Sequence, residues 1–292
     1  MNYDIIIPVT ERNFQTLGLV ANQIKKYVLH RNIILIGKCE FRERANILGC
    51  KFINEDTLYG KLDYCTIREL IYKRDKYAVK RTGWYLQQFL KMSYSMICED
   101  EYYLVWDADT IPLVKMEMFD DKGVPFFDVK EEYHRPYFTT LNRLFNATVK
   151  KSNSYSYISE HMLIKVEYMR KLIDDIEKND SLEGEFYYEK VMNCIRKIDI
   201  SYSGFSEFET YGNYVENNYV GKYKIRRLRT LRNGDRYLHY PPIQREVEWA
   251  AGSYDILSME NRLSMYVEVD KRMNELMKDY TLEEVVKTYS KL

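Results

Sequence analysis

Two short apolar runs flank one helical repeat at the start of the chain, and this pattern restricts the fold more than any other feature. Residues 3–9 and 32–36 are rich in β-branched side chains, and the second run ends at Gly37. Between them, residues 14–28 place apolar side chains three or four positions apart. Such runs are typical of buried parallel strands, and the spacing between them is typical of a helix. The chain is therefore predicted to begin as a strand, a helix and a second strand.

The same alternation continues along the chain and predicts an α/β fold. Apolar runs predict strands at residues 51–53 and 102–106, whereas residues 57–79 give no clear assignment. Because helices alternate with apolar strands, we expect a central sheet covered by helices. The capping box formed by Thr281 and Glu284 predicts a last short helix. Three further helices are expected over residues 82–96, 159–177 and 184–196, and the charged run 177–180 connects the last two.

Length and charge limit the organisation and the partners. A chain of 292 residues forms one large domain or two small ones. No repeat or linker is evident, so we expect one catalytic domain over residues 1–257 and a helical extension over residues 258–292. Lysine and arginine together number 44, as do aspartate and glutamate, so the chain carries no net charge that would favour nucleic acid.

Cysteine usage and hydropathy predict a cytoplasmic protein. The five cysteines are odd in number and never spaced as C-x-x-C, which argues against a disulfide framework and a zinc site. The chain has no basic segment followed by a long apolar stretch near residue 1, and no run approaches the ~18 apolar residues of a membrane span. A reducing compartment is the natural interpretation.

The clearest chemical signal is the segment YYLVWDADTIPL, in which an apolar strand ends at Asp107-Ala108-Asp109. Ligands of open α/β sheets bind at the carboxyl ends of strands. Two carboxylates one residue apart repel each other unless a positive charge lies nearby, and a hard divalent cation with oxygen ligands supplies one. The alternative is a turn in which both aspartates cap backbone amides.

Two classes of enzyme use an apolar strand ending in D-x-D. Phosphatases of the haloacid-dehalogenase type use D-x-D-x-[TV], which Asp107, Asp109 and Thr110 satisfy, with Asp107 as the nucleophile. Their later acidic pair is missing at a strand end here, because Asp174 and Asp175 fall within a helical pattern. The second class consists of glycosyltransferases with the GT-A fold, in which D-x-D holds a divalent metal against the donor diphosphate.

The chain as a whole resembles the GT-A nucleotide-sugar glycosyltransferases, and in particular a bacterial branch of uncharacterised members. The resemblance implies a Rossmann-like α/β fold with a mixed central sheet flanked by helices, and a helical C-terminal tail. It rests on five segments in order: IIIPVTERN, RTGWYLQQFLKM, VWDADTIPL, ISEHMLI and SGFSEFETYGNYV.

The resemblance also implies roles for particular residues. Mn²⁺ or Mg²⁺ would be held by Asp107 and Asp109, with His239 as a third ligand. A nucleoside-diphosphate sugar, with a UDP-sugar as the expected donor, would bind around Ala108 and the metal. Further donor contacts are expected from the loop after the first strand and from the helix before the D-x-D strand, namely Pro8, Thr10, Glu11, Arg12, Arg81, Gln88 and Lys91.

Two acidic segments are candidates for work on the acceptor. Glu207 and Glu209 stand late in the chain, where inverting GT-A enzymes place the carboxylate that deprotonates the acceptor hydroxyl. Ser206 is a plausible N-cap of their helix, and stabilisation of a helix N-terminus is the rival explanation for Glu207. Glu160 and His161 are expected to contact the substrate, although a histidine is more often a structural hydrogen-bonding group.

The motifs and the resemblance together predict a metal-dependent glycosyltransferase of the hexosyl type, acting on a carbohydrate or lipid-linked acceptor. The resemblance alone implies that it acts in surface polysaccharide synthesis. Seven of the fifteen residues from 222 to 236 are Lys or Arg, which would suit a diphosphate or peripheral contact with the inner membrane. A solvated basic loop is the alternative for that segment. The alternatives for the function are a phosphatase using Asp107 and a sugar-nucleotide-binding module without turnover.

Overall fold

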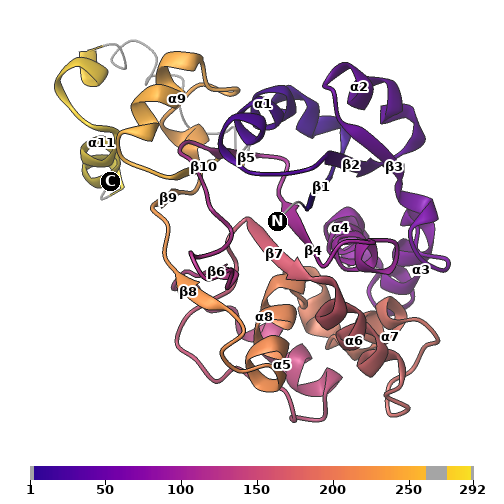
Figure 1. Cartoon of the computed structure of the whole chain (residues 1–292). Helices are drawn as coiled ribbons and strands as arrows, with labels where there is room; N and C mark the ends of the chain where they lie inside the picture. Colours follow the sequence, from indigo (N-terminus) through magenta and orange to yellow (C-terminus); the bar gives the residue numbers. More distant parts are fainter. Residues whose placement is uncertain (1–2, 261–274, 291–292) are drawn as a thin grey trace. The chain divides into compact units, whose positions relative to one another are not determined.

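The computed structural model describes residues 3–260 and 275–290, which fall into two compact units (Figure 1). The first unit comprises residues up to Pro8 together with 31–106 and 118–226. The second comprises residues 9–30, 107–117 and the described part of 227–292.

The first unit is built on a five-stranded mixed sheet in the order β3-β2-β1-β4-β7. The first four strands are parallel, and β7 pairs antiparallel to β4 with Trp106 opposite His161. This confirms the predicted α/β class with a mixed central sheet flanked by helices. The strands are β1 (Asp4–Pro8), β2 (Ile33–Gly37), β3 (Lys51–Asn54), β4 (Tyr102–Trp106) and β7 (His161–Lys165).

Strand order reverses between β1 and β4. The chain adds β2 and β3 on one side of β1 and then crosses to place β4 on the other side. In open α/β sheets this switch point is where ligands bind, outside the carboxyl ends of the two strands. These ends are Pro8 in β1 and Trp106 in β4, and Trp106 directly precedes Asp107.

The helices of the first unit pack apolar faces into one buried core that includes the sheet residues Ile6, Val105 and Ile164. The helix predicted over 82–96 is α4 followed by a short 3-10 turn, and the unassigned stretch 57–79 contains α3. A small parallel pair, β6 (Phe126–Asp128) and β8 (Lys224–Arg226), completes the unit. Its helices are α2 (Arg42–Ile47), α3 (Tyr64–Arg74), α4 (Thr82–Ser93), α5 (Arg135–Leu144), α6 (Val166–Glu177), α7 (Tyr187–Cys194) and α8 (Glu207–Asn218).

The prediction of one helix over residues 159–177 was wrong in its first part. Residues His161–Lys165 form strand β7, and the helix α6 begins only at Val166. The four residues 161–164 are all buried, because β7 lies against β4 at the side of the sheet and beneath helix α6. A short apolar run next to a helix has no periodicity that separates a strand from a helical turn.

The second unit contains helix α1 (Leu17–Tyr27) and a small sheet in the order β5-β10-β9. β10 (Ile256–Ser258) pairs antiparallel to β5 (Thr110–Pro112) and parallel to β9 (Thr230–Leu231). The predicted boundary between residues 257 and 258 thus falls inside β10. Helix α9 (Gln244–Ala251) belongs to the same unit.

The predicted C-terminal extension is described only in part, since residues 261–274 and 291–292 lie outside the described residues. The capping box is confirmed: α11 (Leu282–Tyr289) begins after Thr281, whose hydroxyl accepts a hydrogen bond from the backbone N–H of Glu284 at 3.3 Å. Among the described helices, none is long and apolar enough to cross a bilayer.

Candidate functional site

Asp107 and Asp109 lie in a tight turn that directly follows β4. The backbone N–H of Thr110 donates a hydrogen bond to the carbonyl oxygen of Asp107 at 3.1 Å, which closes the turn over Ala108. Ala108 is buried, whereas both aspartates are half-buried. The small side chain between the two acids therefore faces the protein interior.

The turn is anchored to strand β10 of its own unit. The backbone N–H of Met259 donates to the carbonyl oxygen of Asp109 at 2.9 Å, and the hydroxyls of Thr110 and Ser258 lie 3.1 Å apart. These bonds, which use the backbone and neighbouring hydroxyls, fix the turn. Two half-buried carboxylates on a fixed turn are a suitable start for a cation site.

The predicted donor loop after β1 folds as a short 3-10 helix, Glu11–Gln15. Pro8 is buried as the last residue of β1, and Thr10 caps the turn with its backbone N–H donating to the side chain of Asn13 at 2.6 Å. Glu11 and Arg12 are exposed. Their predicted contact with a donor stays a prediction.

His239 is held by a carboxylate of its own unit. Its Nδ1 atom lies 2.6 Å from Oε1 of Glu246, which is almost fully buried at the start of α9. Metal-binding histidines usually have such a carboxylate behind the ring. Within residues 3–260 and 275–290, however, no three His, Cys, Asp or Glu side chains are grouped to hold a metal. The role of His239 as a third ligand stays a prediction.

The predicted donor residues on and before α4 contact α8 or the segment that leads into it; they are Arg81, Gln88 and Lys91. Arg81 donates to the hydroxyl of Ser203 and lies over the ring of Trp84 at 4.6 Å. Gln88 accepts a hydrogen bond from the backbone N–H of Glu207 at 3.2 Å. The polar stripe on this helix therefore faces protein, and Gln88 is only 2% exposed.

Lys91 and Glu207 form a buried ion pair. Nζ of Lys91 lies 2.8 Å from Oε1 of Glu207, and the two side chains are 3% and 5% exposed. Oε2 of Glu207 accepts no hydrogen bond from any residue that the structure describes. Oε1 of the predicted catalytic carboxylate thus accepts a hydrogen bond from Lys91, whereas Oε2 does not.

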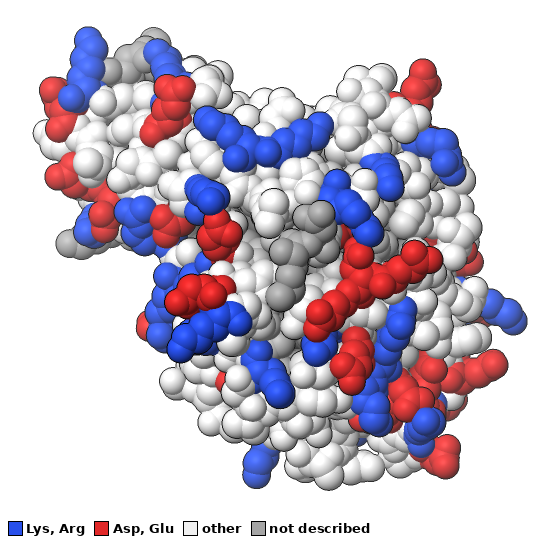
Figure 2. Space-filling model, viewed as in Figure 1, with Lys and Arg blue, Asp and Glu red and all other residues white. Residues whose placement is uncertain are grey.

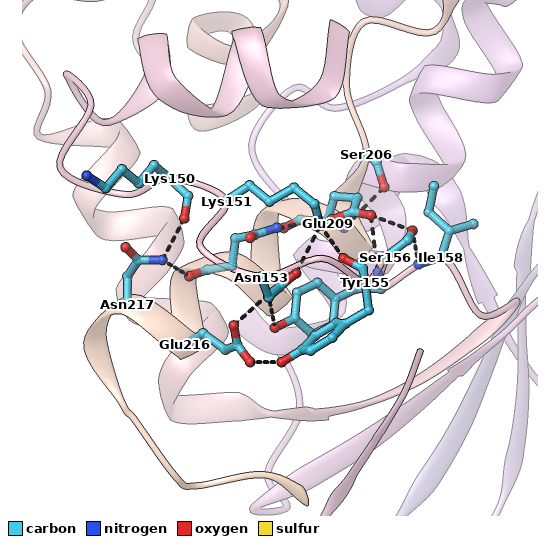
Figure 3. Close-up of polar contacts among 12 residues, drawn as sticks. Lys150, Lys151, Asn153, Tyr155, Ser156, Ile158, Ser206, Glu209, Glu216 and Asn217 are labelled. Atoms are coloured by element: carbon cyan, nitrogen blue, oxygen red, sulfur yellow. Dashed lines mark hydrogen bonds and ion pairs between the residues drawn. The ribbon is translucent and has the colours of Figure 1, made fainter. Parts of the chain in front are cut away.

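Glu209 is committed on both oxygens (Figure 3). Oε1 accepts from the hydroxyl of Ser156 at 2.5 Å and from the backbone N–H of Tyr157 at 3.1 Å, while Oε2 accepts from Asn213 at 3.0 Å. Burial raises the pKa of Glu209, although these hydrogen bonds and Lys151 act in the opposite direction. The geometry supports a structural role for this carboxylate.

Glu209 belongs to a strip of polar side chains by which α8 holds the irregular segment 150–158 (Figure 3). Further along the same strip, Glu216 accepts hydrogen bonds from Asn153, at 2.6 Å, and from Tyr155. Gly212 lets the two elements approach closely, because a Cβ atom at this position would lie 2.3 Å from Cγ of Tyr157. The confirmed N-cap Ser206 begins the helix, accepting from the backbone N–H of Glu209 at 3.2 Å.

His161 lies within a buried chain of polar groups beside the strand that leads to the aspartate turn. Its ring stacks on Trp106 with centroids 4.8 Å apart, and its Nε2 atom lies 2.8 Å from Oδ2 of Asp128. Arg226 donates two hydrogen bonds to Asp128, at 2.6 and 2.8 Å. Burial opposes ionisation of Asp128, but the bonds from Arg226 and His161 outweigh it and lower the pKa to about 2. His161 is therefore positioned by a permanent negative charge.

Glu160 adopts a left-handed backbone conformation with φ of 58° directly before β7. Its buried carboxylate accepts hydrogen bonds from Lys130. A left-handed conformation at a residue other than glycine costs of order 1–3 kcal/mol and persists where surrounding contacts fix it. Glu160 and His161 are both buried and held by other parts of the chain, and their predicted contact with the substrate stays a prediction.

Asp128, Lys130 and Arg226 were missed in the sequence analysis. Lys130 contacts Glu160 and Asp128 contacts His161, from 30 and 33 positions away, and Arg226 donates to Asp128 from 98 positions away. None of them stands in a recognisable motif, and Arg226 was interpreted only as a member of the basic cluster. Local spacing holds no signal for such contacts.

Glu55 was also missed, although it is a buried acid at the carboxyl end of β3. It is 8% exposed, and its carboxylate makes no hydrogen bond within the described residues. Burial, with help from Asp56 and Glu40 and against Lys38, raises the pKa of Glu55 from 4.5 to about 7.

We expect Glu55→Gln to stabilise the protein above neutral pH. The folded state disfavours the ionised carboxylate, so wild-type stability falls as the pH rises from 4.5 through 7 and is unaffected below that range. The shift corresponds to about 3 kcal/mol at pH 8, which glutamine recovers because it remains uncharged. Urea unfolding at pH 4 and at pH 8 tests this; equal differences at both values would show that Glu55 ionises normally.

The basic cluster at residues 222–236 is largely offset by acids. Figure 2 shows basic and acidic side chains interspersed over the face in view. Arg226 pairs with Asp128, and Lys224 pairs with Asp120. In the second unit, Arg229 pairs with Asp255 at 2.7 Å and Arg232 with Glu260 at 3.0 Å. The predicted membrane contact therefore has less free positive charge than the composition indicates.

Comparison with known proteins finds likeness in structure alone. No protein-family model matches the chain, and no curated protein matches it. Mouse xyloside xylosyltransferase 1 aligns over 91% of this chain and 100% of its own, at 12% identity and a TM-score of 0.44. The galactosyltransferase LgtC, solved with donor and acceptor sugar analogues, aligns over 98% and 99%, at 9% identity and a TM-score of 0.47.

The glycosyltransferase GlyE of Streptococcus pneumoniae TIGR4 aligns over all of this chain and 64% of its own, at 11% identity and a TM-score of 0.35. The chain is therefore similar in structure to several glycosyltransferases, the class that its sequence motifs resemble. The function proposed below rests on the chain's own residues.

Proposed function

We propose that this protein transfers a sugar from a nucleoside-diphosphate donor to a carbohydrate or lipid-linked hydroxyl, with a divalent metal ion. The observation that carries the proposal is the turn of Asp107, Ala108 and Asp109. It directly follows β4 at the point where the strand order of the sheet reverses. This is where an open α/β sheet binds its ligand, and the turn supplies two carboxylates there.

The turn suits Mg²⁺ or Mn²⁺, whose coordination is completed by water and substrate, better than it suits a metal whose ligands all come from the protein. Mg²⁺ is usually held by one or two carboxylates together with substrate phosphates and water. Asp107 and Asp109 provide that pair, and the described residues add no third ligand to it. When bound, the metal would neutralise negative charge on the departing nucleotide diphosphate. His239 is retained as a candidate ligand on its contact with Glu246.

Of the two predicted catalytic carboxylates, Glu207 is the better candidate for the acceptor base. Both oxygens of Glu209 accept hydrogen bonds from the chain. Glu207 keeps Oε2 without a hydrogen bond from the described residues, and its Oε1 lies 2.8 Å from the ammonium nitrogen of Lys91. A base must be ionised and have an oxygen available for the proton that it takes.

Glu160 and His161 support the substrate from a fixed arrangement. Nε2 of His161 lies 2.8 Å from Oδ2 of Asp128, and the buried Nδ1 atom has no hydrogen-bond partner within the described residues. We assign the pair to the wall of the sugar site, because buried partners fix both side chains in place and a fixed wall orients a substrate at little entropic cost.

A thermal-shift screen tests the proposal. The full chain is heated with a panel of nucleoside-diphosphate sugars, with Mn²⁺ and with EDTA. We expect at least one donor to stabilise the protein only with the metal, by about 2.7 kcal/mol at 100 times its dissociation constant. Stabilisation that is equal with EDTA contradicts the metal role, and no stabilisation by any donor contradicts the proposed function.

A further inference from the structure

A hollow of about 710 Å³ lies in the first unit. It is formed by the end of α3 with the 3-10 helices η4 (Lys76–Arg81) and η6 (Lys197–Tyr202). Its lining includes Tyr72, Lys76, Tyr77, Lys197 and Ile198. We call this hollow the η4–η6 groove.

Two charged groups of the lining are occupied by the protein itself. The guanidinium of Arg74 donates to the carbonyl oxygens of Met192 and Ile195 at the end of α7. Asp75 accepts from the backbone N–H of Tyr77 at 2.9 Å and from the hydroxyl of Ser201 at 3.1 Å. These contacts fix the walls of the groove and occupy the carboxylate oxygens of Asp75 with neutral donors, and the positive charges of Lys76 and Lys197 in the lining outnumber its single negative charge.

The remaining lining is exposed and carries positive charge beside aromatic surface. Tyr72, Tyr77 and Ile198 are 57%, 75% and 70% exposed. Lys76 and Lys197 are exposed as well, and neither forms an ion pair with a described residue. Nζ of Lys76 lies 5.1 Å from the ring centre of Tyr77. A cluster of exposed apolar groups marks an interaction site more often than a single one does.

Helix direction places the groove at the ligand-binding edge of the sheet. The C-terminal end of α4 lies at the starts of the strands, where Tyr103 donates to the carbonyl oxygen of Lys91 at 2.9 Å. Tyr94, just after α4, donates to Asp4 at the start of β1 at 3.0 Å. Because η4 precedes α4, it lies toward the carboxyl ends of the parallel strands.

We propose that the η4–η6 groove binds an anionic sugar chain, which rests on the proposed function and gives the acceptor its charge class. The exposed rings of Tyr72 and Tyr77 offer flat apolar surface with hydroxyl groups, which suits the C–H faces and hydroxyls of a sugar. Lys76 and Lys197 act as point charges for a carboxylate or a phosphate on that chain.

Isothermal titration calorimetry on the full chain, without donor or metal, tests the proposal. The probes are a hyaluronan hexasaccharide, a phosphorylated maltohexaose and neutral maltohexaose. We expect the two charged probes to bind more tightly than the neutral one, with a difference that shrinks in high salt. The ratio of the dissociation constants of the two charged probes shows whether the groove prefers a carboxylate or a phosphate.

Variants connect this binding to the groove. We expect Tyr77→Ala to weaken binding of the charged probes about two- to tenfold. The double variant Lys76→Gln with Lys197→Gln should remove the preference for charge. Tyr64→Ala and Lys61→Gln alter exposed residues outside the groove and should leave the affinities unchanged.

Three results would overturn the proposal. The first is equal affinity for the charged and neutral probes. The second is that the groove variants leave the affinities unchanged. The third is that a single-stranded hexadeoxynucleotide binds more tightly than the sugar probes and that the same variants abolish its binding. Because no donor is present, these results are separate from the thermal-shift screen. If the sugar probes bind but no donor stabilises the protein in the thermal-shift screen, the groove proposal stands and the transferase proposal is contradicted.

Discussion

Asp109→Asn lowers the rate of sugar transfer by about a thousandfold, which corresponds to roughly 4 kcal/mol of lost transition-state stabilisation. Asparagine has the same shape but lacks the negative charge that holds a divalent cation. The fold should survive, because the carbonyl oxygen of Asp109 and not its side chain accepts from Met259. The measurement is donor hydrolysis and transfer with Mn²⁺ for wild type and variant, with thermal stability recorded beside it.

A matched control and a rival outcome make this result specific. Asp121→Asn removes an exposed carboxylate outside the turn and should leave the rate unchanged. Full activity of Asp109→Asn would end the metal proposal. Covalent phosphorylation of Asp107 would instead identify a phosphatase. That class needs a later acidic pair at a strand end, whereas Asp174 and Asp175 lie on α6 and pair with Lys171.

Lys91→Met destabilises the folded protein by about 3–5 kcal/mol, since it leaves the carboxylate of Glu207 buried without its partner. Both side chains are almost fully buried, so water cannot replace the lost ammonium group. Adding Glu207→Gln to the same chain should recover most of the loss, because the unpaired charge is then removed. Urea unfolding of the two single variants and the double variant measures the coupling between them.

The activity of Glu207→Gln separates a base from a structural acid. If Glu207 takes the acceptor proton, the variant binds donor normally and loses transfer by about a hundredfold or more. Exposed pairs such as Lys73 with Glu69 provide the stability control, since breaking them should cost less than about 1 kcal/mol. Unchanged transfer in Glu207→Gln would leave Lys91 and Glu207 as a structural pair only.

Local patterns predicted much of the fold. The strand at residues 102–106, the aspartate turn after it and the caps at Ser206 and Thr281 all depend on neighbours within a few positions. The strand at residues 161–165 was missed, because its partner is β4, about 60 positions earlier, and only the sheet distinguishes it from a helical turn.

Sequence order and motif offered candidate acids for the site but gave no signal for the partners of those acids. Asp107, Asp109 and Glu207 were identified from order and motif. That Lys91 pairs with Glu207, and that Asp128 holds His161, depends on contacts across 116 and 33 positions. The same kind of tertiary contact brings the polar stripe on α4 against the start of α8, and its predicted contact with a donor stays a prediction. Burial of Glu55 likewise follows from packing that no local spacing encodes.

The close approach of Gly212 to Tyr157 has a consequence for engineering. The backbone of the segment 150–158 pairs with Lys130 at Ser156, and side chains of α8 supply further contacts that order it. Transplanting that loop into another scaffold would therefore remove the groups that shape it. The loop and the helix form one transferable module, and variation on one side is expected to demand matching variation on the other.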